Sequence, residues 1–218
     1  MSYENILHFL HVAGWVFWLG TDIGVFMSAR FSNNREYSVE TRLAMLTLLS
    51  KLDKIPRVCV PLIFTTGVLL ANNYGVDFIP AEIGGPIGTL WFTITLIGVT
   101  RDQHSPFANF ALKANTVAYV VSGLLLGGSA IWSLMGADIM PGWLAVKWLA
   151  FAWTSMFSIG IVITLKPAIV AYMKLGTEGA TEEVNKALSK HLSRVYGVVL
   201  MVYLGTIVAA YFGINKVF

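Results

Sequence analysis

The sequence is poor in charge and holds a single cysteine. Only 12% of its 218 residues are Asp, Glu, Lys or Arg, which is half of the roughly 25% found in soluble domains. This shortage, a hydrophobic content of 56% and a mean hydropathy of +0.68 exclude a disordered chain and argue against a soluble enzyme. The lone Cys59 excludes an intrachain disulfide and a cysteine-based metal cluster. Walker, dinucleotide-binding, His-Glu-x-x-His and nucleophile-elbow motifs are absent as well.

The parts of the sequence that lack charge are long apolar stretches. They lie near residues 5–28, 55–73, 80–100, 115–136, 143–165 and 193–214. Since a helix needs about 20 apolar residues to cross the hydrocarbon, we expect an all-α, polytopic transmembrane helical bundle of about six spans, forming one domain over residues 1–218. The third stretch is interrupted by Gly84, Gly85 and Pro86, so either a kinked span or a re-entrant segment is possible there. The first stretch follows no basic region and reads as a retained helix.

The basic residues predict the orientation. Of the 15 Lys and Arg residues, all except Lys147 and Lys216 lie in the segments between spans one and two, three and four, or five and six. Under the positive-inside rule these segments are cytoplasmic, and the N-terminus and C-terminus both lie on the outer side. The net charge of +3 therefore indicates a lipid bilayer as partner and not nucleic acid, with a bacterial inner (plasma) membrane as the default location.

Two of the basic segments look helical. Residues 39–52 place Val39 and four leucines at helical spacing, with Arg42 and Lys51 off that stripe, which predicts an amphipathic helix leading to span two and able to lie in the interface. Thr181 with the two glutamates after it is a plausible helix start, and we expect that helix to continue through His191 and Arg194 into span six.

The most informative pattern lies in the first span. His8, His11, Trp15, Trp18 and Asp22 follow one another at spacings of three and four residues. Such residues share one face of a helix. Lipid would reject that face, so we expect it to point into the bundle or line a cavity. An ionisable group inside a membrane marks a functional site by default.

Depth in the membrane separates these residues into two levels. His8 and His11 lie in the outer third, level with Lys147, whereas Asp22 lies about 9 Å beyond the midpoint at 1.5 Å per residue. Asp22 can approach Arg57, either as a structural ion pair or as part of a proton path. Lys147 can equally extend toward the outer headgroups, and Trp15 and Trp18 can be packing residues.

The imidazoles suggest two cofactors. A neutral histidine binds haem iron or copper, and glycines in spans one, two and four would leave room for a planar group such as haem b, or for close helix packing. Copper would favour soft ligands, and Met135 and Met140 follow span four at the level of His8 and His11. A metal site containing His11 and His8 is thus predicted, with haem first and copper as the alternative.

Three short stretches resemble a known family. They are Leu10-His11 with Trp18 seven residues later, the segment from Arg42 to Arg57 with the helix after it, and Trp143-Leu144-Ala145-Val146-Lys147. The sequence is similar here to the HemJ family of membrane protoporphyrinogen oxidases and to the related copper resistance D proteins. The resemblance covers about half of the chain. It implies a functional pair of His11 and Lys147, with haem b in the bundle.

Together these features lead to a functional hypothesis. We expect a haem b-binding membrane redox protein of the HemJ type, which passes electrons, and can pass protons, between a substrate and a quinone or redox partner. His11 would be an axial ligand with His8 or Lys147 near it, Trp15 and Trp18 would wall the cofactor, and Asp22 and Arg57 would handle protons. The alternatives are a copper-handling protein with an outer His/Met site and a non-catalytic subunit of a larger membrane complex or homo-oligomer.

Overall fold

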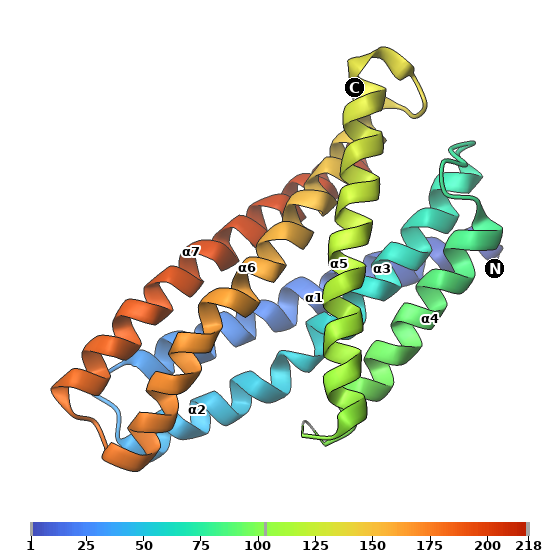
Figure 1. The fold of residues 1–218 in the computed structure, drawn as a ribbon. Coiled ribbons are helices and arrows are strands. Elements are labelled where there is room, and N and C mark those ends of the chain that lie inside the picture. Colours follow the sequence, from blue (N-terminus) through green and yellow to red (C-terminus); the bar gives the residue numbers. More distant parts are fainter. Residues whose placement is uncertain (1, 103, 217–218) are drawn as a thin grey trace.

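The chain folds as a bundle of long helices. A computed structural model describes residues 2–102 and 104–216, and this part contains helices but no strand. The helices are α1 (Tyr3–Asn33), α2 (Val39–Leu52), α3 (Lys54–Asn73), α4 (Ala81–Thr100), α5 (Pro106–Trp132), the π-helical turn η1 (Ser133–Ala137), α6 (Gly142–Glu178) and α7 (Glu182–Asn215). Figure 1 shows α6 and α7 side by side along their length, with α1 behind them and α4 and α5 on the opposite flank.

The helix starts follow the expected capping chemistry. The side chains of Ser2, Ser38, Ser105 and Thr181 each accept a hydrogen bond from a backbone N–H in the first turn of the helix that they precede. The predicted start at Thr181 is therefore confirmed, and α7 runs without a break through His191 and Arg194. Gly75 and Gly179 have positive φ angles where α3 and α6 end, a conformation that glycine adopts without steric cost.

Within the described residues, six helical segments have the length and composition of membrane spans. They are α1, α2 continued by α3, α4, α5 with η1, α6 and α7, which confirms the all-α fold with about six spans and supports an integral membrane protein. The third apolar stretch forms one continuous helix, with Pro86 inside it. Exposed apolar side chains such as Phe9 and Phe17 of α1 cover the outside of the bundle, as a lipid-facing surface requires.

The two ends of the bundle differ in charge. The connections α1–α2, α4–α5 and α6–α7 lie at one end, together with most of the basic residues; we call this end the basic side (Figure 1). The chain ends and the connections α3–α4 and α5–α6 lie at the opposite end, which we call the termini side. Lys216 there donates a hydrogen bond of 2.6 Å to the Tyr74 hydroxyl and lies 5.8 Å from the ring centre of Trp143.

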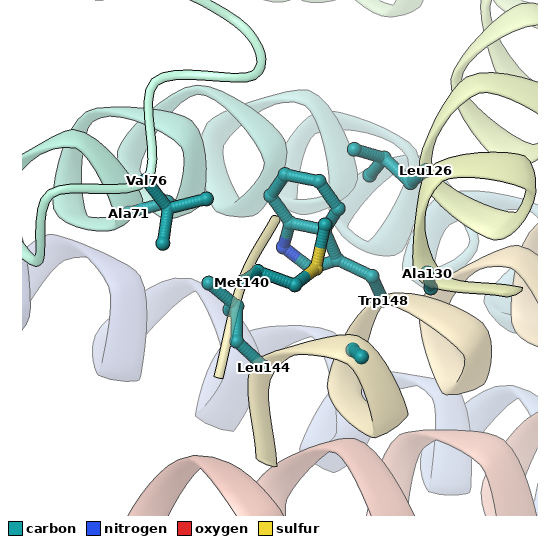
Figure 2. Packing of buried hydrophobic residues seen from close by; sticks show 8 residues of the cluster. Ala71, Val76, Leu126, Ala130, Met140, Leu144 and Trp148 are labelled. Carbon is teal, nitrogen blue, oxygen red and sulfur yellow. The ribbon is translucent and has the colours of Figure 1, made fainter. Parts of the chain in front are cut away.

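Three buried apolar clusters follow one another through the bundle. The cluster on the termini side packs Met140, Leu144 and Trp148 against α3 and α5 (Figure 2). A middle cluster contains Trp18, Val60 and Trp91. The cluster on the basic side joins α6 to α7, and Leu43 and Leu46 of α2 pack against it. The apolar stripe predicted on residues 39–52 thus covers protein core.

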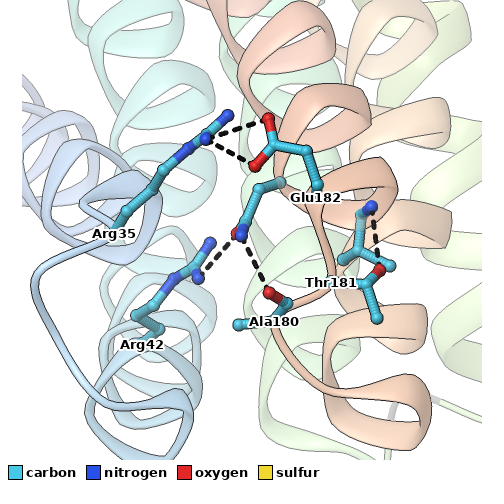
Figure 3. Close-up of polar contacts among 7 residues, drawn as sticks. Arg35, Arg42, Ala180, Thr181 and Glu182 are labelled. Atoms are coloured by element: carbon cyan, nitrogen blue, oxygen red, sulfur yellow. Dashed lines mark hydrogen bonds and ion pairs between the residues drawn. The ribbon is translucent and has the colours of Figure 1, made fainter.

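Arg42 is buried, although the sequence predicts it on the polar side of α2. Its side chain is only 1% exposed. Nε donates to the Ser32 carbonyl at 2.8 Å. Nη1 donates to Asn185 Oδ1 at 2.9 Å, as Figure 3 shows. Asn185 also donates to the Ala180 carbonyl. Arg42 therefore joins α1, α2 and the start of α7, because these backbone and amide oxygens replace the water that an exposed guanidinium would bind.

Candidate functional site

His11 and Lys147 meet near the termini side, although 136 positions separate them in the sequence. His11 projects from α1 and Lys147 from the second turn of α6. Lys147 Nζ lies 3.3 Å from His11 Nε2, and the Thr66 hydroxyl of α3 lies 3.0 Å from His11 Nδ1. Three helices that are distant in sequence thus place their polar groups at one point inside an otherwise apolar bundle.

The hydroxyl of Thr66 determines which nitrogen of His11 carries a proton. Thr66 donates its hydroxyl hydrogen to the Leu62 carbonyl at 2.7 Å. A hydroxyl has only one hydrogen to donate, so toward His11 it then acts as an acceptor of the Nδ1 hydrogen, the arrangement that also leaves Nε2 free to accept from Lys147. In the neutral ring, Nε2 then presents its lone pair to the Lys147 amine. The network therefore defines one tautomer, with the basic nitrogen turned toward Lys147.

Two glycines leave room for the side chains of His11 and Lys147. A Cβ atom at Gly67 of α3 would lie 3.1 Å from His11 Cε1, and one at Gly213 of α7 would lie 2.8 Å from Lys147 Nζ. The second distance is shorter than real Cβ contacts allow. The imidazole therefore lies close to α3 at Gly67, and the amine lies close to α7 at Gly213, in space that a side chain at these positions would take.

Lys147 has no carboxylate neighbour. The three ion pairs within residues 2–102 and 104–216 are Arg35–Glu182, Arg57–Asp53 and Lys174–Glu178. Lys147 instead has the His11 imidazole as its polar contact, inside a helix of membrane-spanning length. An amine placed there without a counter-ion is costly. It therefore favours any ligand that brings negative charge or a hydrogen-bond acceptor.

A cavity of about 210 Å³ adjoins the pair and is lined by His8, His11, Lys147 and many aromatic rings. We call it the His–Lys cavity. Trp15 and Trp18 line it as predicted, with Trp143 and Trp148 opposite on α6. The indole nitrogen of Trp15 is buried and has no hydrogen-bond partner in the described chain. Since an indole N–H only donates, Trp15 and Lys147 are two lining residues with a hydrogen-bond donor that suits a ligand with acceptor atoms.

Asp22 and Arg57 do not line the His–Lys cavity. Both line a larger cavity of about 580 Å³ on the basic side, one turn of α1 beyond Trp18. The expected contact between these two residues does not form, because Arg57 forms its ion pair with Asp53 of the preceding turn. Asp22 has Tyr203 of α7 as its neighbour. The helix-one stripe is thus divided between two cavities.

The His11–Lys147 pair does not fit haem as an axial ligand set. Ligands on opposite faces of a metal, each at about 2 Å, place their nitrogens on the order of 4 Å apart, whereas Nζ and Nε2 are 3.3 Å apart. Nε2 already faces Lys147, and Nδ1 is bonded to Thr66.

The predicted copper ligands are not brought together. Met140 is 5% exposed and belongs to the apolar cluster of Figure 2, Met135 is 81% exposed, and neither lines the His–Lys cavity. Within the described residues, no group of three or more His, Cys, Asp and Glu side chains could hold a metal ion. His8 lines the cavity beside His11 without the further ligands that a metal would need.

Sequence reasoning missed Thr66 and Gly213. Both lie in apolar stretches where small residues also serve helix packing, so no local signal separates them from packing residues. Gly67 is one of the span-two glycines expected to leave room, and here that room is taken by the His11 ring. The Asp53–Arg57 pair, by contrast, has the i, i+4 spacing that predicts contact on one helix face.

Comparisons with known proteins provide no relative. No protein-family model, no curated protein and no solved structure matches the chain.

Proposed function

We propose that the chain is a membrane oxidoreductase of the HemJ type in which His11 and Lys147 handle the protons of a substrate bound in the His–Lys cavity. The observation that carries this proposal is the 3.3 Å approach of Lys147 Nζ to His11 Nε2. The resemblance implies this pair from two short motifs, and the fold brings the same two residues together from α1 and α6. A packing role alone would not require an amine without a carboxylate beside an imidazole.

The pair can perform proton transfer in a defined direction. Thr66 holds His11 with its lone pair on Nε2, so His11 can accept a proton at Nε2 from an N–H or C–H group that loses electrons. Lys147 can transfer its hydrogen bond from Nε2 to a substrate acceptor atom and so position the substrate. The aromatic walls exclude water and suit an apolar, lipid-soluble molecule.

The electrons need an acceptor. We assign this role to a quinone of the bilayer or to a redox partner protein, since the described residues offer proton-transfer groups and no grouping of metal ligands. A reduced tetrapyrrole is the substrate class that the family resemblance implies. Its N–H and C–H groups lose hydrogen on oxidation, and such groups are what His11 Nε2 would serve.

The test is an anaerobic oxidation assay on protein reconstituted in lipid nanodiscs. Protoporphyrinogen is the substrate, dichlorophenolindophenol is a soluble electron acceptor, and porphyrin fluorescence is followed after subtraction of the protein-free rate. Since a positioned acid–base group contributes about 10²–10⁴-fold, His11→Ala and Lys147→Met should each reduce the protein-dependent rate at least about 100-fold.

The chain offers matched controls for both substitutions. Lys166→Met removes an exposed lysine from the same helix α6, and His191→Ala removes a histidine from α7 that lies outside the His–Lys cavity. Both controls should retain the wild-type rate. Equal rates for Lys147→Met and Lys166→Met, in protein that remains folded, would reject the assignment of the pair. A wild-type rate no greater than the protein-free rate would reject the reaction.

A further inference from the structure

The cavity of about 580 Å³ on the basic side has the size of a ligand site. Its walls come from all seven α-helices, and apolar side chains such as Val25, Leu49 and Ile161 form most of them. Its volume lies within the roughly 300–1,000 Å³ of small-molecule sites. Asp22 is the ionisable group on its α1 wall, and Asn115 lines it from α5. We call it the Asp22 cavity.

Two of the residues that line this cavity carry unsatisfied hydroxyl groups. Thr95 and Tyr196 line it, and both hydroxyls are buried without a hydrogen-bond partner in the described chain. Thr95 is only 3% exposed. A helical threonine commonly donates to the carbonyl four residues earlier, as Thr93 does to Thr89 at 2.8 Å, but Thr95 does not. Buried polar groups left in this state are costly, so they indicate a partner molecule that carries acceptor atoms.

The charges around the cavity favour a neutral molecule. The Arg57 guanidinium is neutralised by Asp53, and the remaining cationic side chains of the lining, Lys54 and Arg101, are exposed. These two cations repel an organic cation on its way in, and the Asp22 carboxyl repels an anionic group deeper inside. A neutral molecule with hydrogen-bond acceptors satisfies both conditions and the free hydroxyls.

We propose that the Asp22 cavity binds a lipid-soluble quinone, with carbonyl oxygens that accept hydrogen bonds from Thr95 and Tyr196 and a ring packed against the apolar walls. A quinone is neutral, partitions into the bilayer and carries two acceptor oxygens. Its redox role rests on the proposed function. The quinone takes two electrons from the substrate oxidised at the His–Lys cavity. It also takes two protons from the basic side, the first through Asp22, and leaves as the hydroquinone.

Binding can be measured without any turnover. Decylubiquinone is titrated into the detergent-purified full chain, and quenching of tryptophan fluorescence is followed. Trp91 reports on the site because its indole nitrogen donates to Asn115 Oδ1 at 2.8 Å. Wild type should show saturable quenching. Because each variant loses one hydrogen bond to the ligand, Thr95→Val and Tyr196→Phe should each raise Kd about three- to tenfold. Thr93→Val and Tyr211→Phe, which alter exposed residues of the same two helices, should leave it unchanged.

Quenching that rises linearly without saturation, or equal Kd values for wild type, Thr95→Val and Tyr196→Phe, would overturn the proposal. Displacement of decylubiquinone by oleate at equal concentration would also overturn it, since the cavity would then hold an acyl chain. Lys147→Met should bind decylubiquinone as wild type does. Oxidation with the soluble acceptor but no quinone binding would reject this site alone, whereas quinone binding without any oxidation would reject the proposed function alone.

Discussion

The Thr66 hydroxyl defines the hydrogen-bonding role of both nitrogens of His11. It lies 3.0 Å from Nδ1 and donates its own hydrogen to the Leu62 carbonyl at 2.7 Å. Nδ1 then donates to it, and Nε2 keeps its lone pair for Lys147. A threonine in the middle of an apolar helix thus selects the tautomer on which the proposed chemistry depends, without touching the cavity that would hold a substrate.

Removal of this hydroxyl should impair the reaction more than the fold. Thr66→Val keeps the shape of the side chain but leaves the Nδ1–H of His11 without its acceptor, which costs about 1–3 kcal/mol if the group stays buried. We expect the oxidation rate to fall about tenfold and its pH profile to shift, because the tautomer is no longer held. Thr66→Ser should restore both. Thr116→Val, an exposed site with the same i−4 bond, is the control; identical pH profiles for it and Thr66→Val would refute the assignment.

Haem content provides a direct test of the geometry of the pair. Since the 3.3 Å approach of Nζ to Nε2 leaves no place for an iron atom between them, neither residue should act as an axial ligand in this arrangement. We expect wild type, His11→Ala and Lys147→Met, expressed with ample haem supply, to carry the same amount of haem per chain. Oxidised and dithionite-reduced spectra, with metal analysis on the same samples, measure it. Haem present in wild type and lost from His11→Ala would show that the pair opens to bind iron.

The polar cluster on the basic side predicts a contrast in stability. Asn185→Ala removes the acceptor of Arg42 Nη1, while Nε keeps the Ser32 carbonyl, and it takes the Asn185 amide from the Ala180 carbonyl (Figure 3). A buried charged donor left unpaired costs about 3 kcal/mol. Glu182→Ala breaks the exposed ion pair with Arg35 and should cost below about 1 kcal/mol. Unfolding in detergent, followed by circular dichroism, compares the two. Equal losses would mean that Arg42 finds another acceptor when Asn185 is absent.

The helical architecture could be predicted from the sequence because one physical requirement dominates that architecture. Each membrane span must be apolar over about 20 residues, so the six spans and the cap at Thr181 could be predicted from local patterns. The face of α1 that carries His11, Trp15 and Trp18 could be predicted for the same reason, since lipid contact leaves only one side for polar groups.

The partners of these residues could not be predicted, because they depend on how helices pack. Asp22 was expected to approach Arg57, but the aspartate one turn earlier on the basic side reaches Arg57 first. Arg42 was placed on the polar side of its helix, yet backbone and amide oxygens of α1 and α7 allow it to be buried. Tertiary contacts decide which of two nearby acceptors a cationic side chain binds. These contacts cannot be derived from the residue spacing along one helix.

Gly213 provides the sharpest test of whether the position of Lys147 matters. A methyl group at this position would lie 2.8 Å from Lys147 Nζ, so Gly213→Ala must move the amine from its present position beside His11 while leaving every ionisable group in the chain. We expect the oxidation rate to fall toward that of Lys147→Met. Gly197 lies on the same helix, and its Cβ position meets no atom within 4 Å, so Gly197→Ala introduces the same methyl group without the clash. That control should keep the wild-type rate and gain up to about 1 kcal/mol of stability from helix propensity. Wild-type rates in both variants would show that the amine can act from another position, and the 3.3 Å approach would then have no part in the reaction.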